Sequence, residues 1–131
     1  MNHIGEKFEK IVSEYPIAKE NILFGCNKPK VNGIKPSMRG VKVRFDELQY
    51  FFFYFNEEGI TLFPLNDDGC ALLPWENVVD FDFKSVLFGC KMTVKTNNET
   101  YKFEISNKPS GCPWQKENIA HLKEINCCYA K

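Results

Sequence analysis

Cysteine and histidine are the residue types in this sequence that could bind a metal or supply a nucleophile. The 131 residues include six cysteines and two histidines, His3 and His121. No two cysteines have the Cys-x-x-Cys spacing of a zinc site, and Cys127 and Cys128 are adjacent, an awkward spacing for two ligands of one tetrahedral ion. We therefore expect no metal site and no cofactor. Free cysteine usually behaves as a small core hydrophobe, and we interpret three of them in this way: Cys26, Cys90 and Cys112.

A catalytic pair needs its two side chains within hydrogen-bond distance. His121 follows Cys112 by nine residues near the end of the sequence, and on a helix that spacing is about 13 Å along the axis. No serine lies in a nucleophile-elbow pattern, and no glycine-rich phosphate loop is present in the sequence. Asp80 and Asp82 share one face of a predicted strand, where carboxylates are usually solvated. We therefore expect a protein that is not an enzyme.

Lysine and arginine gather in one segment and acidic residues in the next. The segment from Asn21 to Phe45 has six basic residues and no acidic one, whereas residues 46–83 have nine acidic residues and no basic one. This asymmetry predicts a surface with a basic pole and an acidic pole. Lysine and arginine donate charge-assisted hydrogen bonds to phosphate. The candidate ligand-binding residues are Lys28, Lys30, Lys35, Arg39, Lys42 and Arg44.

The spacing of apolar residues predicts a helix at each end of the chain and strands between them. Apolar residues at a helical period predict a helix within residues 1–15, which Pro16 ends. From about residue 20 to residue 106 the period is two, and short turns favour an antiparallel meander. The last helix is expected at residues 112–126, with Trp114, Ile119, Leu122 and Ile125 as its apolar stripe. Seven strands are expected. The first begins at Ile22, and the other six cover residues 41–45, 49–55, 60–65, 79–84, 91–95 and 101–105.

Six consecutive aromatic residues form the most apolar strand, from Tyr50 to Phe55. Alternate side chains of a strand point to opposite faces, so Phe51, Phe53 and Phe55 are expected in the core. The other face carries Tyr50, Phe52 and Tyr54 and must also be covered. One candidate cover is the N-terminal helix, through Ile4, Phe8 and Ile11. The other is a second molecule, in which case Tyr50, Phe52 and Tyr54 form an interaction surface.

The second half of the sequence resembles the small bacterial pleckstrin-homology (PH)-like domains. The resemblance is carried by residues 73–78 (Leu-Pro-Trp-Glu-Asn-Val), residues 87–96, the Asn97-Asn98 turn, residues 100–103 and the last helix. It implies a mainly β fold, a seven-stranded antiparallel barrel or sandwich capped by a C-terminal helix, here with an extra N-terminal helix. In PH domains that bind inositol phosphates, the loop between the first two strands is basic, and Lys35, Lys42 and Arg44 fit that pattern.

Length and composition limit the class of protein. A chain of 131 residues with 44% apolar residues fits one domain, covering residues 1–131. A net charge of zero argues against a dedicated nucleic-acid binder. No apolar run is long enough for a transmembrane helix, and the N-terminus does not resemble a signal peptide, so we expect a cytoplasmic protein.

The expected function is therefore a non-catalytic binding or interaction module on a PH-like scaffold. The expected partner is an unidentified protein or a second copy of the chain. A second hypothesis is recognition of an anionic lipid or phosphate through the basic loop at residues 28–44, with peripheral contact with an anionic membrane. A third is a small inhibitor or immunity-type protein that uses its acidic surface.

Overall fold

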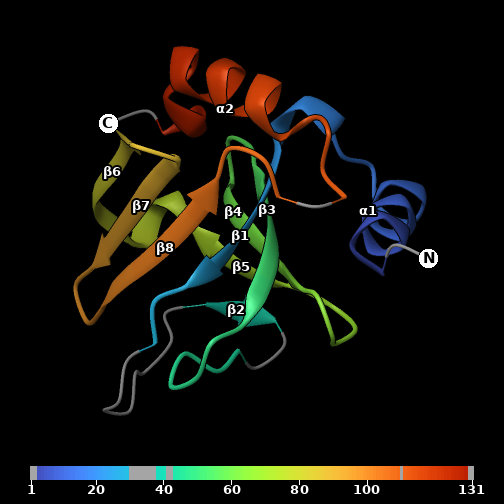
Figure 1. Cartoon of the computed structure of the whole chain (residues 1–131). Helices are drawn as coiled ribbons and strands as arrows, with labels where there is room; N and C mark the ends of the chain where they lie inside the picture. Colours follow the sequence, from blue (N-terminus) through green and yellow to red (C-terminus); the bar gives the residue numbers. More distant parts are fainter. Residues whose placement is uncertain (1–2, 30–37, 41–42, 110, 130–131) are drawn as a thin grey trace.

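An antiparallel sheet of eight strands forms the centre of the computed structural model, which describes residues 3–29, 38–40, 43–109 and 111–129 (Figure 1). The sheet order is β2-β5-β4-β3-β1-β8-β7-β6. The strands are β1 (Ile22–Asn27), β2 (Arg39–Gly40), β3 (Tyr50–Phe55), β4 (Gly59–Pro64), β5 (Ala71–Pro74), β6 (Val78–Val86), β7 (Gly89–Thr96) and β8 (Thr100–Ser106). Helices α1 (His3–Glu14) and α2 (Gln115–Glu124) lie at the two ends of the chain.

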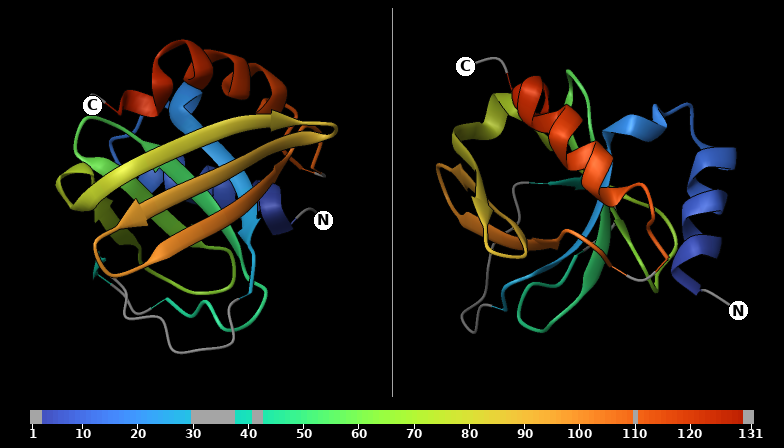
Figure 2. Two further views of the ribbon diagram at one scale, coloured as in Figure 1. Left: turned by 90° about the vertical axis from the view of Figure 1, so that its left-hand side faces the viewer. Right: turned by 45° about the horizontal axis from the view of Figure 1, so that its top comes forward.

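The sheet is strongly bent but is not closed into a barrel, since β2 and β6 remain its two edges. β1 lies in the middle and pairs with β3 on one side and β8 on the other. It therefore joins the strands of the first half of the chain to those of the second half, and the two halves face each other across the core (Figure 2). The prediction of a mainly β, antiparallel fold with a helix at each end is confirmed. Of the two predicted architectures, barrel or sandwich, the closed barrel is wrong, and so is the count of seven strands.

Two segments differ from the predicted strands. Residues 43–45 belong to no strand, although Val43 and Phe45 are buried and Arg44 is exposed as the alternation predicts. Residues 41 and 42 lie outside the described residues. β5 was not predicted, because its four residues are apolar without alternation and end at Pro74. It pairs with β4 and with the two residues of β2.

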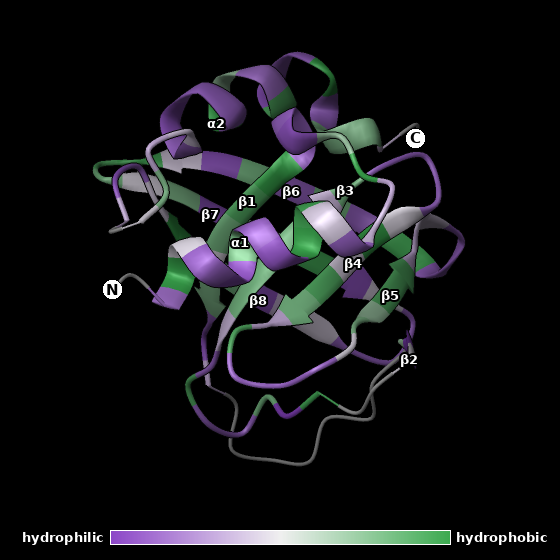
Figure 3. Cartoon of the chain, turned by 90° about the vertical axis from the view of Figure 1, so that its right-hand side faces the viewer, coloured by the Kyte–Doolittle hydropathy of each residue, from purple (hydrophilic) through white to green (hydrophobic). Residues whose placement is uncertain are grey.

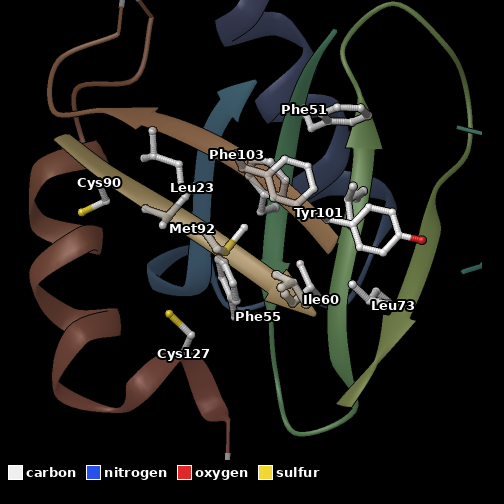
Figure 4. Packing of buried hydrophobic residues seen from close by; sticks show 14 of the residues in the cluster. Leu23, Phe51, Phe55, Ile60, Leu73, Cys90, Met92, Tyr101, Phe103 and Cys127 are labelled. Carbon is white, nitrogen blue, oxygen red and sulfur yellow. The ribbon is translucent and has the colours of Figure 1, made fainter. Parts of the chain in front are cut away.

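The main core lies between the two halves of the sheet. Phe51, Phe53 and Phe55 are fully buried, as the alternation of the aromatic strand predicts. They pack with Met92 of β7 and with side chains of β8, as the close view of the core shows (Figure 4). At the start of β6, the predicted alternation of buried and exposed residues is not observed. A register shift between Val78 and Asp80 turns Val78 inward and leaves Val79 exposed.

α1 covers the opposite face of the aromatic strand. It lies across the sheet near β1 and β4 (Figure 3). Its buried residues Phe8 and Ile11 pack in a second apolar cluster that contains the fully buried Phe52. The ring centroid of Phe8 is 6.2 Å from that of Phe52 and 4.7 Å from that of Trp114. Of the two covers considered for this face, the N-terminal helix is therefore the one that buries Phe52.

α2 is shorter than predicted and closes one end of the core. Ile119 and Leu122 are buried in the main core, whereas Trp114 belongs to the second cluster and Ile125 is exposed. Two polar side chains of this helix, Gln115 and Asn118, are also buried. Among the described residues, no helix is both long enough and apolar enough to cross a bilayer.

We expect the substitution Phe8→Ala to lower the free energy of unfolding by about 3 kcal/mol, because it removes a buried ring from the contact between α1 and the sheet. Urea-induced unfolding followed by circular dichroism measures the change. Glu9→Ala, at the adjacent exposed position, is the control and should change the free energy by less than about 0.5 kcal/mol. Equal stability of the two variants would show that α1 does not stabilise the fold through Phe8.

Candidate anion-binding site

Three of the six predicted basic residues can be placed: Lys28, Arg39 and Arg44. Lys30, Lys35 and Lys42 lie outside the described residues. Arg39 of β2 forms an ion pair with Glu76, which follows β5, while β2 itself pairs with the first two residues of β5. Arg44 also lies beside carboxylates. The prediction that basic and acidic residues occupy separate poles of the surface is therefore wrong for Arg39 and Arg44.

Arg44 lies beside two carboxylates. Its guanidinium donates hydrogen bonds to Asp46 at 3.2 and 2.9 Å and lies 3.7 Å from a carboxylate oxygen of Glu47. The hydrogen bond from Arg44 lowers the pKa of the Asp46 carboxyl. All three side chains are largely exposed, so this cluster contributes little to stability.

Lys28 is the described member of the predicted set that lines a pocket. The pocket has a volume of about 620 Å³ and lies beside the segment that follows β1 and the β7–β8 hairpin. Within the described part of the chain, its lining residues are Lys28, Pro29, Phe45, Thr93, Lys95, Thr100, Tyr101 and Lys102. Three lysines and two threonines therefore meet at one pocket, which we name the basic pocket.

The register of the strands explains how these residues meet. Thr93 lies opposite Lys102, and Lys95 lies opposite Thr100, in the β7–β8 ladder. The backbone N–H of Lys28 donates a hydrogen bond of 2.9 Å to the carbonyl oxygen of Lys102, so the chain leaving β1 stays beside β8. Residues directly opposite each other in an antiparallel ladder project on the same face. The outer face of three adjacent chain segments thus carries one row of cationic and hydroxyl groups.

The described lining of the basic pocket carries positive charge, while Asp80 and Asp82 lie opposite Lys95 and Thr93 on β6. No acidic side chain lines it among the described residues, and Lys28, Lys95 and Lys102 take part in none of the ion pairs found there. Phe45 and Tyr101 lie beneath, both buried, with ring centroids 5.1 Å apart. Lysine ammonium groups and threonine hydroxyls are donors that phosphate oxygens accept. The volume is within the range of small-molecule pockets.

Sequence reasoning missed Lys95 and Lys102, which are far from Lys28 along the chain. The signal for them was local: both alternate with buried apolar residues in β7 and β8, so both were expected on an exposed face. Only the pairing of β1 with β8 places them beside Lys28. That pairing could not be derived from the spacing of apolar residues.

The three residues of the predicted interaction surface lie in different environments. Phe52 is fully buried under α1. Tyr54 is half-buried, and its hydroxyl accepts a hydrogen bond of 3.4 Å from the backbone N–H of Ala18. Tyr50 remains 44% exposed, with its ring stacked on Phe24 at 5.8 Å between centroids. Tyr50 is the one of the three that offers a substantial exposed area.

The side chain of Asn21 links one thiol to one imidazole, since its amide nitrogen lies 3.9 Å from the Sγ atom of Cys128 and its oxygen contacts His121. All six cysteines are free, and burial raises the pKa of Cys112 to about 12, which keeps this thiol protonated at neutral pH. The Nε2 atom of His121 lies 2.9 Å from the side-chain oxygen of Asn21. Within residues 3–29, 38–40, 43–109 and 111–129, no group of three histidine, cysteine, aspartate or glutamate side chains is arranged to hold a metal ion.

The segment that carries the resemblance to PH-like domains forms β5 to β8 and the start of α2. Its tryptophan, Trp75, packs on Phe81 and Tyr129 with ring centroids 5.2 and 5.0 Å away. The indole N–H of Trp75 donates a hydrogen bond of 2.8 Å to the carbonyl oxygen of Asn56. Trp75 thus anchors the junction between β5 and β6.

Comparisons of this chain with protein-family models, with curated proteins and with solved structures found no match.

Proposed function

We propose that this protein is a non-catalytic binding module of PH-like type that binds a phosphate-bearing anion in the basic pocket. The observation that carries the proposal is the meeting of Lys28, Lys95 and Lys102 around one pocket of about 620 Å³, whose described lining has no acidic residue. The nearby carboxylates Asp80 and Asp82 lie on β6, opposite Lys95 and Thr93. Each lysine can donate up to three hydrogen bonds, so a ligand with several phosphate oxygens would satisfy the three ammonium groups at once.

The order of the elements supports the PH-like part of the proposal. The strands β1, β3, β4 and β5 form one run of neighbours, and β6, β7 and β8 form a second run, with α2 following β8. This is a meander of seven main strands with a C-terminal helix, to which β2 and α1 are additions. The loop between β1 and β3, which begins at Lys28, then corresponds to the basic loop that the resemblance implies.

The placement of the reactive side chains supports the non-catalytic part. Cys112 is buried and protonated, and His121 is hydrogen-bonded to Asn21, which separates its imidazole from the Cys128 thiol. Asp80 and Asp82 are both exposed on β6. These are the environments of structural and solvated side chains rather than those of activated nucleophiles and bases.

Isothermal titration calorimetry with inositol hexakisphosphate tests the proposal. Lys95→Glu and Lys102→Glu should each weaken binding at least tenfold, because each removes a cation and adds an anion at the pocket. Affinity of the wild-type protein should fall as salt is raised. Lys116→Glu makes the same charge change at an exposed position of α2 and is the matched control.

The source of the phosphate is separated by a second titration. Vesicles that contain phosphatidylinositol bisphosphate test a lipid headgroup, whereas the soluble inositol phosphate tests a free ligand of the same chemistry. If the pocket variants and the control bind inositol hexakisphosphate equally well, or if the wild-type protein does not bind it at low salt, the proposal is wrong.

A further inference from the structure

Large apolar side chains that are exposed concentrate on one hairpin. Of the seven found among the described residues, four belong to β6 and to the turn that follows it: Val79, Val86, Leu87 and Phe88. The two residues of the turn itself are the most exposed, Leu87 at 83% and Phe88 at 76%. Turns usually carry glycine, asparagine, aspartate or serine, so a Leu-Phe turn requires a reason other than the geometry of the chain.

The backbone of the turn is held in place although its two side chains are largely exposed. Val86 and Gly89 lie opposite each other at the end of the β6–β7 ladder. The carbonyl oxygen of Phe88 accepts a hydrogen bond of 2.9 Å from the backbone N–H of Asn107, which follows β8. Leu87 and Phe88 are therefore presented to solvent from an ordered backbone, and little conformational entropy remains to be lost when they are buried.

Lysines surround this apolar tip. Lys84 of β6 lies directly opposite Lys91 of β7, and Lys108 follows Asn107; all three are exposed. The nearest acidic residue in the same rows is Glu104, opposite Lys91 on β8. Like charges directly opposite each other in a ladder are unfavourable in water. A nearby anionic surface would relieve the repulsion between Lys84 and Lys91.

We propose that the β6–β7 tip, Leu87 and Phe88, inserts into an anionic lipid bilayer while Lys84, Lys91 and Lys108 contact the headgroups. A convex two-residue tip with a basic collar fits the boundary between acyl chains and anionic headgroups, where apolar burial and lysine attraction act together. A second copy of the chain is a poorer occupant, since the basic pocket and three other pockets among the described residues each have at least two charged side chains in the lining.

This inference does not depend on the basic pocket. The tip lies at the β6–β7 end of β7, whereas Lys95 lies near the opposite end, at the β7–β8 turn (Figure 2). Variants of the tip should leave the binding of inositol hexakisphosphate unchanged. Failure of one proposal is therefore visible without failure of the other.

Sedimentation with vesicles of phosphatidylcholine and phosphatidylserine tests the insertion. The double variant Leu87→Ser/Phe88→Ser should bind about a hundredfold more weakly than the wild-type protein, because two apolar side chains no longer leave water. Leu48→Ser changes another exposed leucine, outside the hairpin, and is the matched control. Lys84→Glu/Lys91→Glu should also weaken binding, and vesicles without phosphatidylserine should bind the wild-type protein less.

A fluorescence measurement reports insertion directly. In Phe88→Trp, added vesicles should shift the tryptophan emission to shorter wavelength, and brominated lipids should quench it. The wild-type protein provides the background from Trp75 and Trp114, and Leu48→Trp is the control for an exposed tryptophan outside the hairpin. The proposal is overturned if the Phe88→Trp emission does not respond to phosphatidylserine vesicles. Equal vesicle binding by the wild-type protein and the tip double variant would also overturn it.

Discussion

Replacing Gln115 with leucine should lower the free energy of unfolding by about 4 kcal/mol, because three hydrogen bonds, two of them buried, are lost together. The side-chain oxygen of Gln115 accepts from the N–H of Phe24 at 2.9 Å. Its amide nitrogen donates to the carbonyl oxygens of Phe24 at 2.6 Å and of Ser106 at 3.0 Å. The residue is fully buried, so leucine leaves these backbone groups without a partner and without water. Urea-induced unfolding measures the change.

The Gln115→Glu variant adds a pH dependence with a defined sign. Its second carboxyl oxygen would face two carbonyl oxygens, so the protonated form is favoured and the pKa of this carboxyl in the folded state rises above its unfolded value. The variant should therefore keep its stability below the unfolded pKa and lose it as pH rises through the folded pKa. Glu117→Ala, at an exposed position two residues along α2, is the control. A leucine variant as stable as this control would contradict the role of Gln115.

Replacing Gly25 with alanine should cost about 3 kcal/mol, because the middle of the sheet has no room for a methyl group. A Cβ atom at Gly25 would lie 2.5 Å from the carbonyl oxygen of Glu104 and 2.9 Å from the Cγ1 atom of Ile105. The first of these is backbone, which cannot rotate away as a side chain can. β1 would have to move away from β8, which weakens the pairing that joins the two halves of the sheet.

The measurement is again the free energy of unfolding, with Cys26→Ala as the neighbouring control. Cys26 is half-buried, so its truncation should cost only about 1 kcal/mol. Hydrogen exchange in the Gly25 variant should become faster in β1 and β8 before it does in the β3–β4 ladder. A Gly25→Ala protein as stable as the wild type would show that β1 and β8 separate more easily than the packing implies.

The sequence predicted burial and secondary structure well where they depend on the spacing of nearby residues. The burial of Phe51, Phe53 and Phe55 follows from a period of two, and the position of α1 follows from a period of 3.6. At the start of β6, Val78 is buried in place of Val79, because a β-bulge shifts the alternation by one position. Nothing in the local sequence indicates this bulge. The open edges of the sheet depend on how far it bends, which is a property of all eight strands.

The candidate site was predicted less well, for a related reason. Lys28 was selected from the run of basic residues around it, yet Arg39 in the same run is paired with Glu76 through β2 and β5. Lys95 and Lys102 joined the site through the β1–β8 pairing, which links residues far apart in the chain. The run of basic residues in the sequence therefore identified Lys28, one of the three lysines of the basic pocket. The positions of Lys95 and Lys102 depend on how the strands pair in the folded protein.

The central position of β1 also has a consequence for biosynthesis. Of the strands in this sheet, β1 is translated before the others and β3 soon after it, but the other side of β1 pairs with β8, the strand that is translated last. Until β8 has been translated, the nascent chain presents an unpaired strand edge beside an aromatic strand. Ribosome-bound chains that stop short of residue 100 should therefore be the species that need a chaperone.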